Sequence, residues 1–128
     1  MSYYFNKTVN GDFDEVLDRV VESLKQDGFG VLTDIDVKET LHKKLGVEFR
    51  SYRILGACNP GFAYKALQAE DKIGTMLPCS VVVQEIAPGE VEVAAIDPLA
   101  SMQAIENREL GPVAHTVQQM LKAVVDRV

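Results

Sequence analysis

Two thiols and the residues beside them are the groups in this sequence whose types and spacing could do chemistry. The chain contains only two cysteines, Cys58 and Cys79, and each lies in a short motif at the end of a predicted strand. Two thiols at neighbouring strand ends can exchange electrons, hold a soft metal ion, or pack as small apolar side chains. If the protein has a site, we expect it where these two thiols face each other.

The first motif, Ile54–Pro60, has the pattern of a strand that leads directly into a helix. Asn59 is a residue type that caps helices, and Pro60 suits the first helical position because its missing N–H would have no partner there. The N-terminus of this helix would favour the thiolate of Cys58 and would offer N–H groups to a carboxylate or phosphate. The motif therefore indicates a reactive thiol or a binding site for a small ligand.

The second motif, Leu77–Val83, begins the next strand with Pro78 and Cys79. Taken together, the two motifs predict a ligand-binding site. Its residues are Cys58, Asn59, Pro60, Pro78 and Cys79. The sequence identifies no catalytic residue and no cofactor. We expect no metal, because two thiols do not supply the four ligands of a zinc site.

The elements that must position these motifs follow from hydrophobic periodicity and from turn residues. Strands are predicted over residues 3–9, 29–35, 49–58, 79–86 and 90–96. Helices are predicted over residues 13–27, 37–45, 61–70 and 112–127, with a brief helix near residue 102 and a loop over 71–78. The pattern predicts an α+β fold with a single domain over residues 1–128. We expect an antiparallel or mixed sheet of about five strands, with helices packed mainly on one face.

Two of these segments carry predictions about which side chains face the core. In the helix over residues 13–27, Asp12 and Glu15 form a capping box, apolar residues recur every three or four positions, and Gly28 supplies the stop. In the strand over residues 29–35, simple alternation puts Phe29, Val31, Thr33 and Ile35 on one face. Both patterns predict which side chains of these segments face the core.

Composition limits the classes of partner. The net charge of −6 argues against nucleic-acid binding, which needs a basic face, and against docking on anionic lipid. No apolar run approaches the length of a membrane span, and the first residues lack the pattern of a signal peptide. Two cysteines without an export signal favour reduced thiols and a cytoplasmic location.

Both cysteine motifs, followed by the segment Val91–Pro98, resemble the family known as domain of unknown function 302, or DUF302. The segments Gly28–Leu32 and Leu41–Gly46 fit the same pattern, so the resemblance extends over nearly the whole chain. It implies a small, single-domain bacterial or archaeal protein with an α+β fold that pairs as a homodimer. It implies no activity.

Three functions are compatible with these observations. The first is a homodimeric module that binds a small apolar or anionic ligand near Cys58, Asn59 and Cys79. The second is a thiol-based redox or cofactor-handling enzyme that uses Cys58 and Cys79. The third is a structural domain with two buried, inert cysteines.

Overall fold

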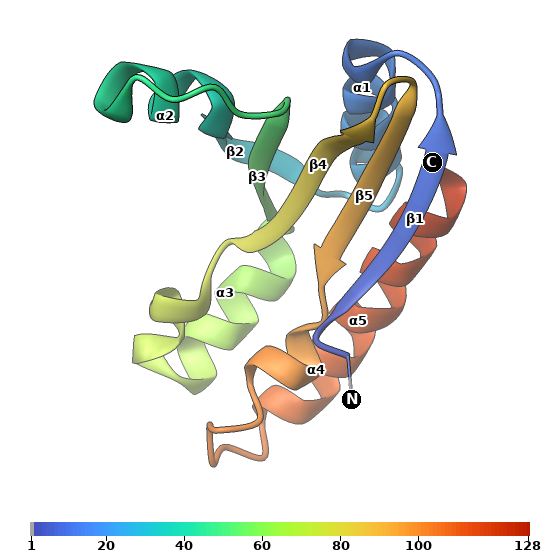
Figure 1. Cartoon of the computed structure of the whole chain (residues 1–128). Helices are drawn as coiled ribbons and strands as arrows, with labels where there is room; N and C mark the ends of the chain where they lie inside the picture. Colours follow the sequence, from blue (N-terminus) through green and yellow to red (C-terminus); the bar gives the residue numbers. More distant parts are fainter. Residues whose placement is uncertain (1) are drawn as a thin grey trace.

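Five strands form one antiparallel sheet, in the order β1-β5-β4-β3-β2 (Figure 1). The computed structural model describes residues 2–128. The strands are β1 (Tyr4–Asn10), β2 (Gly30–Asp36), β3 (Tyr52–Cys58), β4 (Cys79–Ala87) and β5 (Glu90–Ile96). The helices are α1 (Phe13–Gln26), α2 (Val37–Leu45), α3 (Pro60–Ala69), the 3₁₀ helix η1 (Asp71–Met76), α4 (Pro98–Ser101) and α5 (Leu110–Arg127). All four strand pairs are antiparallel, so the predicted α+β class is confirmed and the sheet is not mixed.

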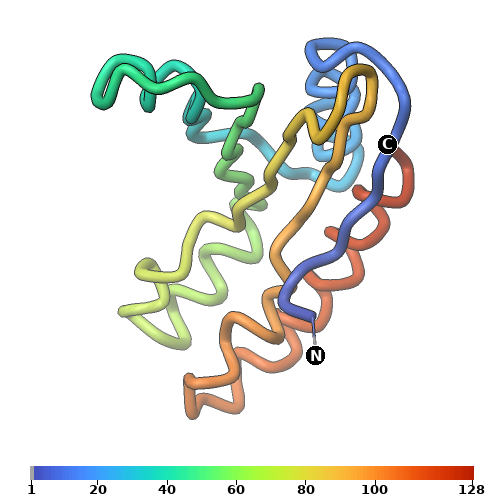
Figure 2. Tube along the Cα trace, in the orientation of Figure 1, coloured from blue at the N-terminus to red at the C-terminus, as the bar shows by residue number. Residues whose placement is uncertain are grey.

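The hydrophobic core lies between one face of the sheet and the helices α1 and α5. Asp12 caps α1 by accepting a hydrogen bond from the backbone N–H of Glu15 at 3.3 Å, as the capping box predicts. The stripe of α1 is buried as expected, with Val16, Val20 and Leu24 fully inaccessible to solvent. The first strand and the last helix run beside each other although they are far apart in sequence (Figure 2).

The prediction that Phe29, Val31, Thr33 and Ile35 share one face of β2 is wrong. The ladder pairs Val31 with Ala57 but Thr33 with Gly56, so Leu32 is an extra residue at a β-bulge. The bulge reverses the alternation: Phe29 is buried in the core, whereas Ile35 lies on the other face and is 48% exposed.

The structure differs from the predicted helices in two further segments. The predicted loop over residues 71–78 contains η1, which is anchored by the fully buried side chain of Ile73. The last helix begins at Leu110 rather than Pro112, because the first turn of a helix tolerates a proline without a backbone N–H. No helix within residues 2–128 has the length and apolar character needed to cross a membrane.

The opposite side of the sheet, which we call the open face, is not covered by α1 or α5. Figure 1 views the sheet from this side, with both helices behind the strands. Strand register assigns alternate residues of each strand to this face. The open face consists of Tyr4, Asn6, Thr8, Thr33, Ile35, Tyr52, Ile54, Gly56, Ser80, Val82, Gln84, Glu92, Ala94 and Ile96, and at the strand ends of Asn10, Gly30, Cys58, Ala87 and Glu90.

Candidate functional site

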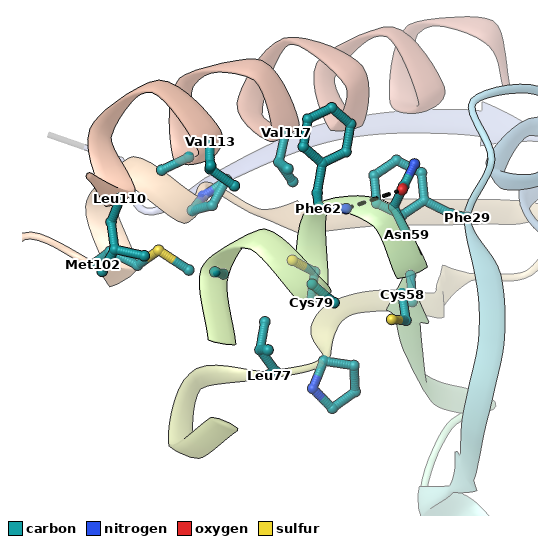
Figure 3. Close-up of a pocket in the computed structure, with 16 residues that line it drawn as sticks. Phe29, Cys58, Asn59, Phe62, Leu77, Cys79, Met102, Leu110, Val113 and Val117 are labelled. Atoms are coloured by element: carbon teal, nitrogen blue, oxygen red, sulfur yellow. Dashed lines mark hydrogen bonds between the residues drawn. The ribbon is translucent and has the colours of Figure 1, made fainter. Parts of the chain in front are cut away.

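A pocket lies where the ends of β3 and β4 meet α3, α4 and the first half of α5 (Figure 3). Its free volume is about 40 Å³, which is room for about three water-sized groups. Sixteen residues line it. They are Phe29, Ala57, Cys58, Asn59, Phe62, Ala63, Ala66, Leu77, Pro78, Cys79, Pro98, Met102, Leu110, Val113, Ala114 and Val117.

Small side chains on facing helices account for the space. Ala63 and Ala66 of α3 and Ala114 of α5 all line the pocket, and methyl groups leave a gap where larger residues would interdigitate. The gap separates two apolar clusters. The main core contains Phe29 and Val117, and a smaller cluster is centred on Ala66, Ile73 and Leu110. The pocket is therefore a space between two packed regions of one domain.

The two cysteines line the same pocket but do not face each other, which corrects the sequence-based expectation. Cys79 stands opposite Ala57 in the β3–β4 ladder, and both side chains are buried on the core side of the sheet. Cys58 is the next residue along β3, so its side chain is directed to the other face. Figure 3 shows the two sulfur atoms pointing in different directions, and the structure has both cysteines free.

Burial controls the chemistry of Cys79. Cys79 is 8% exposed to solvent. Burial, reinforced by the nearby Cys58, raises the pKa of the Cys79 thiol to about 11. Near neutral pH this group is therefore an uncharged thiol, which suits an apolar wall and is a weak nucleophile.

Asn59 is occupied by structural contacts. Its side-chain oxygen accepts a hydrogen bond from the backbone N–H of Phe62 at 3.5 Å, which is the predicted helix cap. Its side-chain amide donates to the carbonyl oxygen of Asp27, at the end of α1, at 3.1 Å. Gly28 lies so close that a Cβ there would be 3.1 Å from the Asn59 amide nitrogen. Asn59 thus joins α3 to α1.

The two prolines have different positions relative to the pocket. Pro78 lines it and also lies over the backbone of β3, where a Cβ on Gly56 would come within 2.6 Å of the proline ring. Pro60 occupies the first turn of α3, is exposed, and is not part of the lining. Of the five residues that the sequence selected, the structure therefore brings together Cys58, Asn59, Pro78 and Cys79.

The lining can hold an uncharged, apolar group. None of its residues is charged at neutral pH, and its one amide, that of Asn59, already has partners on both atoms. Within residues 2–128 no three side chains of the His, Cys, Asp and Glu types form a group suited to a metal ion. The carboxylates of Asp34 and Asp36 are engaged elsewhere, by Arg53 at 2.9 and 3.5 Å.

Sequence reasoning missed most of the pocket wall. The sequence indicates Phe62, Ala63, Ala66 and Ala114 only as helix residues, and Val113 and Met102 only as core residues. One usable signal is the alanine pattern. Alanines that are three residues apart on α3 leave a shallow strip on one helix face.

Comparison with known proteins identifies relatives of this chain. The model of the family described as "Domain of unknown function DUF302" matches residues 5–128. A crystal structure of an uncharacterized conserved DUF302 protein from Bacillus stearothermophilus is similar, with a TM-score of 0.90 and 31% sequence identity. The match covers 99% of this chain and 98% of that one. The comparison with curated proteins gives no match.

Proposed function

We propose that this chain, which belongs to the DUF302 family, is a binding module that takes a small, uncharged apolar ligand into the pocket beside Cys79. One observation carries the proposal: a cavity is left between two apolar clusters and is lined without a charged side chain. Apolar voids of this kind exclude water and accept apolar guests, because a guest restores the contacts that the lining lacks.

The proposal selects the apolar ligand from the two kinds that the sequence left open. An anion at the N-terminus of α3 would need free N–H groups and a cation nearby. Pro60 has no N–H, the N–H of Phe62 is bonded to Asn59, and no Lys, Arg or His lines the pocket. The volume of about 40 Å³ admits a short stretch of an alkyl chain, such as one end of octanol, rather than a flat ring system.

The ligand hypothesis can be tested with two simple probes, octan-1-ol and inorganic phosphate. Amide resonances would be followed by NMR during titration with each probe. Octanol is expected to shift residues around the pocket, among them Ala66 and Ala114, while phosphate leaves them unchanged. Phosphate shifts confined to Gly61 and Phe62, without an octanol response, would contradict the proposal and favour the anion.

A matched pair of variants tests the location. Ala63→Leu fills the pocket from α3 at a half-buried position, whereas Ala123→Leu adds the same atoms to α5 at a half-buried position outside the lining. Octanol binding should weaken at least tenfold in the first variant and stay unchanged in the second. Equal binding by both variants would mean that octanol binds elsewhere.

The proposed module is a homodimer in a cytoplasmic setting. What supports pairing is the resemblance to the family together with exposed apolar side chains on the sheet, including Tyr4 and Ile35 at 39% and 48% exposure. What supports the location is the pair of free thiols. Sedimentation equilibrium at micromolar concentration should give twice the mass of the chain, and a monomer mass would contradict this part.

Redox chemistry at Cys58 and Cys79 is the alternative function, and inert structural cysteines are a third possibility. The redox alternative has support from the two thiols at one pocket, and rapid alkylation of Cys58 at neutral pH would strengthen it. Against it stand the divergent directions of the thiols and the raised pKa of Cys79. A pocket that binds neither probe, with two unreactive thiols, would leave the structural function.

A further inference from the structure

The open face of the sheet contains a hollow of about 370 Å³, which is larger than the pocket beside Cys79. Small side chains, Ser80 and Ala94, make its floor low. Tyrosines stand around it: Tyr3 and Tyr4 come from the start of the chain and β1, and Tyr52 comes from β3. Tyr3 and Tyr4 are 65% and 39% exposed. This face therefore combines raised aromatic edges with a recessed centre.

A row of hydrogen bonds crosses the open face and balances its charges. Arg50 donates from Nε to the Gln84 side-chain oxygen at 2.7 Å, and Gln84 donates to the Glu92 carboxylate at 2.8 Å. Asn6 donates to the other oxygen of that carboxylate at 3.0 Å. The Arg50 guanidinium also lies over the rings of Phe49 and Tyr52, at 4.3 and 5.6 Å.

This charge balance matters because the chain as a whole carries −6. Two copies repel each other on average, so a face whose central charges are balanced suits self-association better than a face with unbalanced charge. Along the middle of the strands, Glu92 is the charged residue of the open face, and it shares one hydrogen-bonded row with Arg50. Glu90 adds a second negative charge, at the end of β5 and away from the hollow. The centres of two open faces can therefore approach each other without placing unbalanced like charges in contact.

We propose that a second copy of this chain docks on the open face, sheet against sheet, in a symmetric dimer. The inference rests on the homodimer part of the proposed function and names its surface. In such a dimer the tyrosine edges of one copy enter the hollow of the other, because a twofold axis presents the same patch on both copies. Paired sheets of this kind pack about 10 Å apart with interlocking side chains.

The area of the open face is sufficient for this. Five strands spaced about 4.8 Å apart and roughly 23 Å long have a flat footprint on the order of 550 Å². The accessible area is larger than the footprint because side chains roughen the surface. A stable interface needs at least about 600 Å² from each partner, so one open face can supply a whole interface without help from α2.

The experiment compares two substitutions to arginine, each judged by sedimentation equilibrium of the full chain. Ala94→Arg puts a charge in the hollow of both copies, while Leu45→Arg removes an apolar side chain that is 68% exposed on α2, outside the open face. We expect Ala94→Arg to raise the dimer Kd roughly 100-fold and Leu45→Arg to leave it unchanged. Ser80→Arg, at an exposed position in the same hollow, serves if Ala94→Arg fails to fold.

Other results would overturn the inference. A monomer mass for the wild-type chain would show that no second copy docks on this face. A dimer that survives Ala94→Arg and Ser80→Arg but separates in Leu45→Arg uses α2 instead. An octanol titration of the Ala94→Arg monomer keeps the two proposals apart: binding there shows that the pocket works without the dimer. In the wild-type chain, octanol shifts confined to Tyr4, Tyr52 and Ala94 would make the hollow a small-molecule site and would count against a second copy there.

Discussion

Asn59 donates a hydrogen bond from the N-terminus of α3 to the carbonyl oxygen of Asp27, at 3.1 Å, and so links α3 to the end of α1. The contact gives Asn59, the residue after Cys58, a structural role. α3 forms one wall of the pocket, and α1 is part of the main core. The position of the pocket wall therefore depends on a side chain that the sequence marked as a ligand contact.

Removing the Asn59 side chain should destabilise the protein. Asn59→Ala loses the cap and leaves the Asp27 carbonyl without its donor, at a cost of about 1–2 kcal/mol in the free energy of unfolding. Asn59→Asp keeps a capping oxygen but lacks the amide donor, so its loss should be smaller. Urea unfolding measures both variants. Wild-type stability in Asn59→Ala would contradict the linking role.

Gly56 should not tolerate a side chain. A Cβ there would collide with the Thr33 hydroxyl and would come within 2.6 Å of the Pro78 ring. We expect Gly56→Ala to lower the free energy of unfolding by roughly 2 kcal/mol or more, because both neighbours must move. Gly30→Ala is the control: it lies on the adjacent strand, and a Cβ there meets nothing within 4 Å. Equal stability of the two variants would show that the Gly56 site relaxes freely.

The raised pKa of Cys79 predicts a loss of stability in alkali. A solvent-exposed cysteine thiol, as in the unfolded chain, has a pKa of 9.0, and burial in the folded protein raises the pKa of Cys79 to about 11. Between these values the unfolded chain releases the proton and the folded chain keeps it, so stability falls as pH rises from 9 to 11. Below pH 9 the thiol is protonated in both states and contributes no pH dependence.

The size of this effect is on the order of 3 kcal/mol. The difference in stability between wild type and Cys79→Ala isolates it from tyrosine and lysine titration. The stability gap between the two proteins should narrow as the pH rises through the window. A constant gap would mean that Cys79 has an ordinary pKa in the folded protein.

Mild oxidation with diamide should not join Cys58 to Cys79 in the folded chain. The two side chains are directed to opposite faces of the sheet, and a disulfide requires Cβ atoms that point toward each other. Intact mass and peptide mapping measure the linkage, with urea-unfolded protein as the control in which the bond can form. Fast, complete formation in the folded protein would favour the redox alternative.

The parts of the fold that depend on local pattern were predictable. The Asp12 cap, the stripe through Val16 and Val20, and the Asn59 cap depend on residues within one or two helical turns, and all are confirmed. The bulge at Leu32 depends on how β2 pairs with β3, which no local pattern records. Its consequence, the exposure of Ile35, was therefore predicted wrongly.

The candidate site shows the same division between local and long-range information. Alternation along β3 correctly separates Ala57 from Cys58, but the position of Cys79 opposite Ala57 depends on the register between two strands. The pocket itself arises where Ala63 of α3 and Ala114 of α5 meet across a gap of 50 residues in the sequence. A short sequence motif can therefore indicate one edge of such a site but not its opposite wall.

Crystals of the protein under xenon pressure would show whether the pocket beside Cys79 accepts an apolar guest, because xenon enters apolar cavities and its electron density gives its position. We expect a xenon peak beside Cys79, in contact with Ala66 and Val117, and a weaker peak or none in Ala63→Leu. An empty pocket, or xenon bound only in the hollow of the open face, would contradict an apolar binding site beside Cys79.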